Sequence, residues 1–201
     1  LTGMENSKQK QIASPDGAIS FLFGVFGLLL WYMPNHQNTA GMLLTVGLMW
    51  IVLSAGALAA SLLNVRIGRP KGNINLIATL LLGFFPGLNT LVVFGAKMMN
   101  IPYEPRIFGL IYMIGSVFCF GVMVKRFSKA LYRTVSPFMV GAGLLLLGMG
   151  DLLSVPVLMK AGGWAMFIFA VLSFYYGLSV MYALYGGRLP QGPSLDSLMK
   201  K

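Results

Sequence analysis

Six long apolar runs follow one another along the chain, and short stretches rich in Pro, Gly, Asn and charge separate them. A transmembrane helix needs roughly 20 mainly apolar residues, with a range of about 17 to 25. Each run meets that length, so the pattern predicts an all-α integral membrane protein with six transmembrane helices. The expected spans cover residues 17–33, 41–63, 74–98, 107–124, 135–153 and 162–185.

Composition places the whole chain in the membrane class. Hydrophobic residues make up 57% of its 201 residues and charged residues only 10%. A soluble domain carries about 25% charged residues, so this chain lacks the charge to cover a water-exposed surface. We expect one membrane domain over 17–187, an N-terminal tail over 1–16 and a C-terminal tail over 188–201. Met4 resembles a native start, and the three residues before it are interpreted as added ones.

The positive charge of the chain predicts its orientation. The formal net charge is +10, from 15 Lys and Arg against 5 acidic residues. The basic residues lie between the apolar runs, which indicates membrane topology rather than nucleic-acid binding. Loops on the cytoplasmic side carry an excess of Lys and Arg, so both termini are predicted to be cytoplasmic, in a plasma (inner) membrane. The basic residues on that side are Lys8, Lys10, Arg66, Arg69, Lys71, Lys125, Arg126, Lys129, Arg133, Arg188, Lys200 and Lys201.

The third run contains helix-breaking residues at its centre. Pro86 has no N–H, and its ring crowds the carbonyl of Leu82, while Gly83 and Gly87 lower the cost of bending there. Freed backbone groups at membrane depth are tolerated only inside protein or beside a water-filled cavity. The sequence therefore predicts a third helix broken near Gly83-Pro86-Gly87, at a point that does not face lipid. An ordinary proline kink that serves only packing is the alternative.

Few polar side chains lie inside the predicted spans. The candidates for a pore lining are Ser20, Pro86, Asn89, Tyr176 and Ser179. Two of them, Tyr176 and Ser179, are three residues apart and so share one face of the last helix.

One acid, Asp151, lies in or near a span. A carboxylate at the bilayer centre costs about 2.5 to 3.5 kcal/mol on insertion scales. Asp151 is therefore a candidate for proton coupling, and the alternative is an acid at a helix end in water.

The sequence offers little catalytic chemistry. Cys119 is the one cysteine and His36 the one histidine, which excludes an internal disulfide and a cysteine-based zinc site. The spans contain no Ser-His-Asp set, no paired carboxylates and no phosphate-binding loop. We therefore expect no enzyme, no metal site and no cofactor.

Several short motifs resemble the acetate uptake transporter family, the acetate–succinate transporters. They are Gly109 to Tyr112 (G-L-I-Y), Ala161 to Trp164 (A-G-G-W), Gly187 to Pro190 followed by Gly192, and Lys71-Gly72-Asn73. The resemblance covers nearly the whole chain. The first helix departs from it, because Ser14 to Ser20 replace the N-P-A-P-L-G-L signature of the family and keep only its first proline. The chain is thus identified as a divergent member.

The resemblance implies an architecture and a function. The architecture is a homo-hexamer with a pore through each six-helix subunit. The pore narrows at an apolar constriction, which falls on Phe23, on Leu82 or Gly83, and on Val140. The function is a channel or proton symporter for a small monocarboxylate, with acetate first and succinate as a further candidate. Protons, the carboxylate and the lipid bilayer are then the expected partners.

Two other functions remain open at this point. The lost first-helix signature is compatible with the same fold serving a small neutral solute such as urea or an amide. The glycine-rich helices and few polar spans are also compatible with a membrane subunit that transports nothing.

Overall fold

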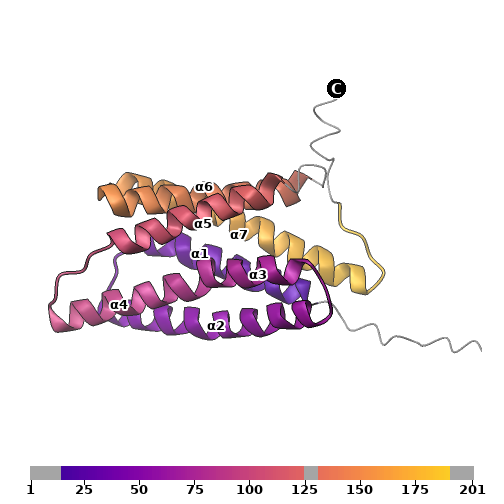
Figure 1. Cartoon of the computed structure of the whole chain (residues 1–201), viewed down its shortest axis with the longest axis horizontal. Helices are drawn as coiled ribbons and strands as arrows, with labels where there is room; N and C mark the ends of the chain where they lie inside the picture. The colour runs from indigo at the N-terminus through magenta and orange to yellow at the C-terminus, as the bar shows by residue number, and fades with distance from the viewer. Residues whose placement is uncertain (1–14, 125–130, 191–201) are drawn as a thin grey trace, which may run out of the picture.

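The computed structural model describes residues 15–124 and 131–190 as a bundle of long helices (Figure 1). Six helical spans are long and apolar enough to cross a membrane, which confirms the predicted all-α, six-span architecture. Most of the two tails and several of the basic residues counted for topology, such as Lys8 and Lys125, lie outside the described residues. The elements are α1 (Asp16–Asn35), α2 (Ala40–Arg66), α3 (Lys71–Thr79), η1 (Leu80–Phe84), α4 (Phe85–Met99), α5 (Arg106–Val124), α6 (Leu131–Leu153) and α7 (Pro156–Leu184).

The helices form a ring in which each span packs against its neighbours. α1 lies between α2 and α7, α6 lies between α5 and α7, and the third span, made of α3, η1 and α4, packs against α2. α5 meets the third span at η1, which closes the ring. Because the number of spans is even, α1 begins and α7 ends at the same end of the bundle (Figure 1).

Among the described residues, pairs of facing glycines bring helix backbones into direct contact at three places. In each pair, a Cβ on either glycine would lie 2.6–3.5 Å from the carbonyl oxygen of the other. Helices in lipid lack a hydrophobic force between them, so close packing at small residues holds them together. The pairs are Gly17 with Gly177 (α1–α7), Gly109 with Gly148 (α5–α6), and Gly143 with Gly162 (α6–α7).

The third span is continuous, and the predicted break near Gly83-Pro86-Gly87 is wrong. α3, η1 and α4 follow one another without interruption, and η1 is a single π-helical turn. At its end the Phe85 amide donates to the Leu80 carbonyl, five residues back. A π turn inside an α-helix accommodates a local change in hydrogen bonding without ending the helix.

The carbonyl that Pro86 leaves free has another donor. An α-helical residue at this position would donate its amide to the Leu82 carbonyl, and proline has no amide hydrogen. The indole Nε1 of Trp50 on α2 donates to that carbonyl at 3.0 Å, and the Trp50 side chain is fully buried. The helix therefore continues through Pro86 while the Leu82 carbonyl stays hydrogen-bonded, as a membrane interior requires.

The helix ends differ from prediction most clearly at α7. This helix begins at Pro156 rather than at residue 162, so Lys160 lies inside its second turn. Proline suits the first position of a helix because its missing amide hydrogen would have no partner there. The exposed Lys160 side chain does not interrupt the helix.

We predict that Trp50→Phe lowers the free energy of unfolding by about 1–2 kcal/mol, because the buried Leu82 carbonyl loses its donor. Unfolding of the purified protein in mixed micelles, followed against the SDS fraction, measures the change. Trp164→Phe is the control, since the Trp164 residue is 53% exposed. Equal losses in the two variants would contradict the role given to the hydrogen bond.

Candidate functional site

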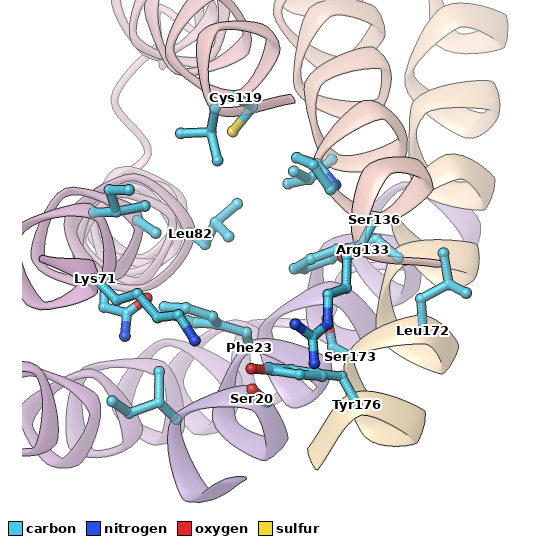
Figure 2. A pocket seen from close by; sticks show the side chains of 18 of the residues that line it. Ser20, Phe23, Lys71, Leu82, Cys119, Arg133, Ser136, Leu172, Ser173 and Tyr176 are labelled. Atoms are coloured by element: carbon cyan, nitrogen blue, oxygen red, sulfur yellow. The ribbon is translucent and has the colours of Figure 1, made fainter. Parts of the chain in front are cut away.

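A cavity of about 200 Å³ opens between α1, α3, α5, α6 and α7. It lies at the end of the bundle where α1 begins, since Asp16, the first residue of α1, is part of its lining. We call it the basic cavity, because Lys71 and Arg133 are part of its lining. Figure 2 shows these two side chains approaching the opening from opposite sides.

Four helices line the basic cavity with residues at positions i, i+3, i+4 and i+7. That spacing is one face of an α-helix, so each helix turns a single stripe toward the cavity. The stripes are Asp16, Ile19, Ser20 and Phe23 on α1; Lys71, Ile74, Asn75 and Ala78 on α3; Arg133, Ser136, Pro137 and Val140 on α6; and Phe169, Leu172, Ser173 and Tyr176 on α7.

Charge lies at the mouth of the basic cavity, and apolar side chains lie deeper. The α1 stripe runs from Asp16 to Phe23 and the α6 stripe from Arg133 to Val140. Seven residues of α-helix span about 10 Å, so the apolar end of each stripe is two turns inside the protein. The cavity therefore changes from a charged entrance to an apolar interior.

An acidic side chain sits among the cations of the mouth. The Asp16 carboxylate lies 3.8 Å from an Arg69 nitrogen and 3.6 Å from Lys71 Nζ. It also accepts a hydrogen bond of 2.9 Å from the amide Nδ2 of Asn64, which is fully buried on α2. These contacts tie the beginning of α1 to the end of α2 and the beginning of α3.

A second cavity of about 440 Å³ opens at the opposite end of the bundle. Its lining contains Asp151, and the described residues that line it include no Lys, Arg or His. We call it the acidic cavity. Asn89, Tyr103 and Tyr112 also line it, and the Tyr103 hydroxyl donates to Asn89 Oδ1.

The loop residue Tyr103 is a stable hydrogen donor in the acidic cavity. Burial, together with the negative charge of Asp151, raises the pKa of Tyr103 to about 12. Both causes penalise the phenolate. The hydroxyl therefore keeps its proton, and its bond to Asn89, throughout the physiological pH range.

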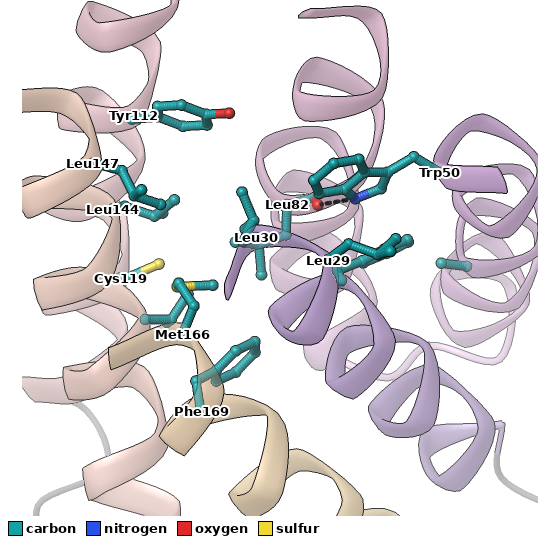
Figure 3. Close-up of a cluster of buried hydrophobic side chains, with 13 residues drawn as sticks. Leu29, Leu30, Trp50, Leu82, Tyr112, Cys119, Leu144, Leu147, Met166 and Phe169 are labelled. Carbon is teal, nitrogen blue, oxygen red and sulfur yellow. Dashed lines mark hydrogen bonds between the residues drawn. The ribbon is translucent and has the colours of Figure 1, made fainter. Parts of the chain in front are cut away.

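Apolar side chains separate the two cavities, which share no lining residue. Phe26 on α1, Leu144 on α6 and Met166 on α7 are each 0% exposed, and we call them the apolar plug. They belong to one buried cluster with Leu82, which lines the basic cavity, and Leu30, which lines the acidic one (Figure 3). This buried cluster therefore includes residues from the linings of both cavities.

The residues expected at the constriction lie near one another, with one exception. Phe23, Leu82 and Val140 all line the basic cavity. Of the two alternatives on the third helix, Leu82 faces the cavity and Gly83 faces α2. A Cβ at Gly83 would lie 2.2 Å from Ser54 Oγ.

The other candidate residues divide between several places. Ser20 and Tyr176 line the basic cavity, whereas Asn89 and Asp151 line the acidic one. Pro86 and Ser179 are buried between helices and line neither cavity. Pro86 contributes instead through the π turn that precedes it.

Lys71 and Arg133, which the sequence predicts only as topology signals, also line the basic cavity. Arg133 belongs to α6, which begins four residues earlier than predicted. The signal was present in the spacing, because Arg133, Ser136 and Val140 share one helix face. That face becomes visible only when the helix is extended past its apolar run to include its charged first turn.

Comparison with known proteins gives a match in fold. No protein-family model matches the chain, and no curated protein matches its sequence. Among solved structures, the chain is similar to one described as the bacterial acetate channel SatP, with a TM-score of 0.69 and 18% sequence identity. The match covers 90% of this chain and 100% of the other. It confirms, at the level of the fold, the resemblance seen in the sequence motifs, and the neighbour is a channel rather than an enzyme.

We predict that Tyr103 ionises only above about pH 11. Its pKa is raised from the model-compound value of 10.0 to about 12, so the stability that this shift contributes is fully present below pH 10 and is lost as the pH rises through 12. The difference in absorbance at 295 nm between the wild type and Tyr103→Phe measures the titration. A difference that develops by pH 10 would contradict the half-buried, hydrogen-bonded hydroxyl.

Proposed function

We propose that this chain forms a membrane channel or proton-linked transporter for a small monocarboxylate, with acetate as the first candidate and succinate as a further one. The observation that carries the proposal is a pair of cavities that enter from opposite ends, with a buried apolar cluster that includes residues of both linings. The similarity in fold to an acetate channel supports it. Each protomer of a homo-hexamer would hold its own path, in a plasma membrane with both termini cytoplasmic.

The plug favours the protonated form of a weak acid. An ionised carboxylate loses its water at an apolar layer, and that loss is far more costly than for the neutral acid. An apolar constriction also excludes hydrated ions by dewetting. Phe26, Leu144 and Met166 leave no polar partner for an ion in transit, whereas the flexible Met166 side chain can yield to a small neutral molecule.

The two mouths suit the two protonation states of such an acid. Asp151 in the acidic cavity repels an anion and tolerates the neutral acid. Lys71 and Arg133 in the basic cavity attract the anion that forms once the proton is lost. The predicted topology places the basic cavity on the cytoplasmic side, where an acid that enters in its neutral form would ionise.

We predict that proteoliposomes take up labelled acetate, and that an inward pH gradient raises the rate because it increases the neutral acid outside. Phe23→Ala should raise uptake of butyrate relative to acetate by roughly tenfold, since a larger acid then fits the lining of the path. The measurement is initial uptake of each acid, with and without the gradient.

The control for this experiment is Phe138→Ala. It makes the same chemical change on α6, at a residue that is 42% exposed and outside both cavity linings. Acetate uptake that ignores the gradient would identify a passive channel for the anion. Flux of urea or acetamide but not of acetate would identify a neutral-solute channel. If the folded protein carries none of these solutes, the alternative of a membrane subunit that transports nothing is favoured.

We predict that Asp151→Asn flattens the pH dependence of acetate uptake, if this carboxylate exchanges protons with the path. Tyr103 and Tyr112 are the other titratable groups that line the same cavity, and both carry hydroxyls rather than charges at neutral pH. Glu104→Gln is the matched control, because the Glu104 side chain is 62% exposed and lies outside the cavity lining. An unchanged profile in Asp151→Asn would remove the proton-coupling role.

A further inference from the structure

We propose that the basic cavity is a binding site for one carboxylate anion, held between Lys71 and Arg133, and that Asp16 competes with this anion for Lys71. The proposal rests on the proposed function in taking the transported acid as the ligand. It goes further in naming the residues that hold the ionised form and the internal group that the anion displaces.

Two tyrosines hold the guanidinium of Arg133 in position at the cavity. Its guanidinium lies 5.7 Å from the ring centre of Tyr132 and 5.3 Å from that of Tyr176, within the range of cation–π attraction. Its Nε donates a hydrogen bond of 2.9 Å to the Tyr132 hydroxyl. None of the ion pairs formed among the described residues involves Arg133. The tyrosines fix the guanidinium and leave its terminal nitrogens available, and these nitrogens form the fork that carboxylates accept.

Hydroxyl groups complete the donor set. Ser136, Ser173 and Tyr176 line the cavity, and no hydrogen bond within the described part of the chain engages their side chains. Ser20 is different, because its hydroxyl already donates to the Asp16 carbonyl at 2.8 Å. The unengaged hydroxyls can each donate to a carboxylate oxygen, which is an acceptor only.

Asp16 holds Lys71 loosely. The Asp16 carboxylate and Lys71 Nζ are 3.6 Å apart, beyond the 2.7–3.2 Å of a direct hydrogen bond. The Lys71 side chain is half exposed, where an ion pair contributes about 0.2–1 kcal/mol. A carboxylate in the cavity can therefore draw Lys71 away from Asp16 at little cost, while Asn64 continues to hold Asp16 in place.

The charges in the lining fit a monoanion. Lys71 and Arg133 are the cations and Asp16 is the acid among the described lining residues, so the formal charge of these three is +1; Arg69, beside Asp16, lies outside the lining. One monocarboxylate neutralises the cavity, whereas a dicarboxylate would leave it negative. Removing the Asp16 charge raises the formal charge to +2 and should favour a dicarboxylate.

Equilibrium binding tests the site without any need for transport. We would titrate the full chain in lipid nanodiscs with ¹³C-labelled acetate at neutral pH and low salt, where the acid is ionised, and follow the ligand by NMR. Lys71→Gln should weaken acetate binding by about tenfold, as for loss of a hydrogen bond to a charged group. Asp16→Asn should tighten it by about two- to fivefold, because the competing charge is gone, and should tighten succinate binding further.

Matched controls separate this site from a general effect of charge. Arg66→Gln removes one positive charge at the exposed end of α2, outside the cavity lining, and should leave acetate binding unchanged. Binding of acetamide, the neutral analogue of acetate, should be unchanged in Lys71→Gln. The Asp16→Asn variant keeps a side-chain oxygen that can accept the hydrogen bond from Asn64. Circular dichroism checks the fold of every variant. Arg133→Gln is a second variant that should also weaken acetate binding.

Each outcome decides the proposal. No acetate binding to the wild type, or equal binding in the wild type and both the Lys71 and Arg133 variants, would overturn the site. Weaker binding in Asp16→Asn would overturn the competition. The proposed function is judged separately, because the flux measurements can fail while the anion still binds, and flux can persist in a protein whose basic cavity binds no anion.

Discussion

Contact between helix backbones at paired glycines is the interaction on which the rest of this structure depends. In a bilayer, apolar side chains gain nothing by leaving lipid for protein, so helices associate through close packing and hydrogen bonds. The pair Gly109–Gly148 joins α5 to α6, Gly143–Gly162 joins α6 to α7, and Gly17–Gly177 joins α7 to α1. Four helices are thereby fixed in rotation about their axes, and the stripes that line the basic cavity on α1, α6 and α7 all turn inward as a result.

The third span completes the ring by different means. Its neighbour α2 supplies Trp50, whose indole hydrogen bonds to the carbonyl left free by Pro86. Gly83 and Gly87 pack against Ser54, Trp50 and Ile51 on α2. The glycines and proline in the middle of this span therefore serve its attachment to α2, and they place Leu82 rather than Gly83 on the cavity. A single π turn is the structural cost of keeping the span helical.

The fold was more predictable than the site, for a physical reason. Hydropathy reports which segments are long and apolar enough to cross a bilayer, and the six spans follow directly. It does not report how a helix is rotated, which depends on contacts between residues far apart in sequence, such as Gly17 with Gly177. Family resemblance points to Phe23 and Val140, which both line the basic cavity. Hydropathy does not point to Arg133, because this residue precedes the apolar run. Ser179 lines neither cavity, because three-residue spacing from Tyr176 gives a shared helix face only to within a wide arc.

The unequal charges of the two mouths have an electrical consequence. The basic cavity carries Lys71 and Arg133 beside Asp16, and the acidic cavity carries Asp151 without a described cation in the lining. A path of the proposed kind between them would have a polarity along its length that acts on ions and leaves neutral molecules untouched. An anion meets opposite fields at the two entrances, so its conductance would differ with the direction of travel, while a neutral acid would pass equally from either side. A transporter of the proposed kind would therefore select acids by charge state, and the pH on each side of the membrane would set how much of a given acid is in the neutral form that it carries.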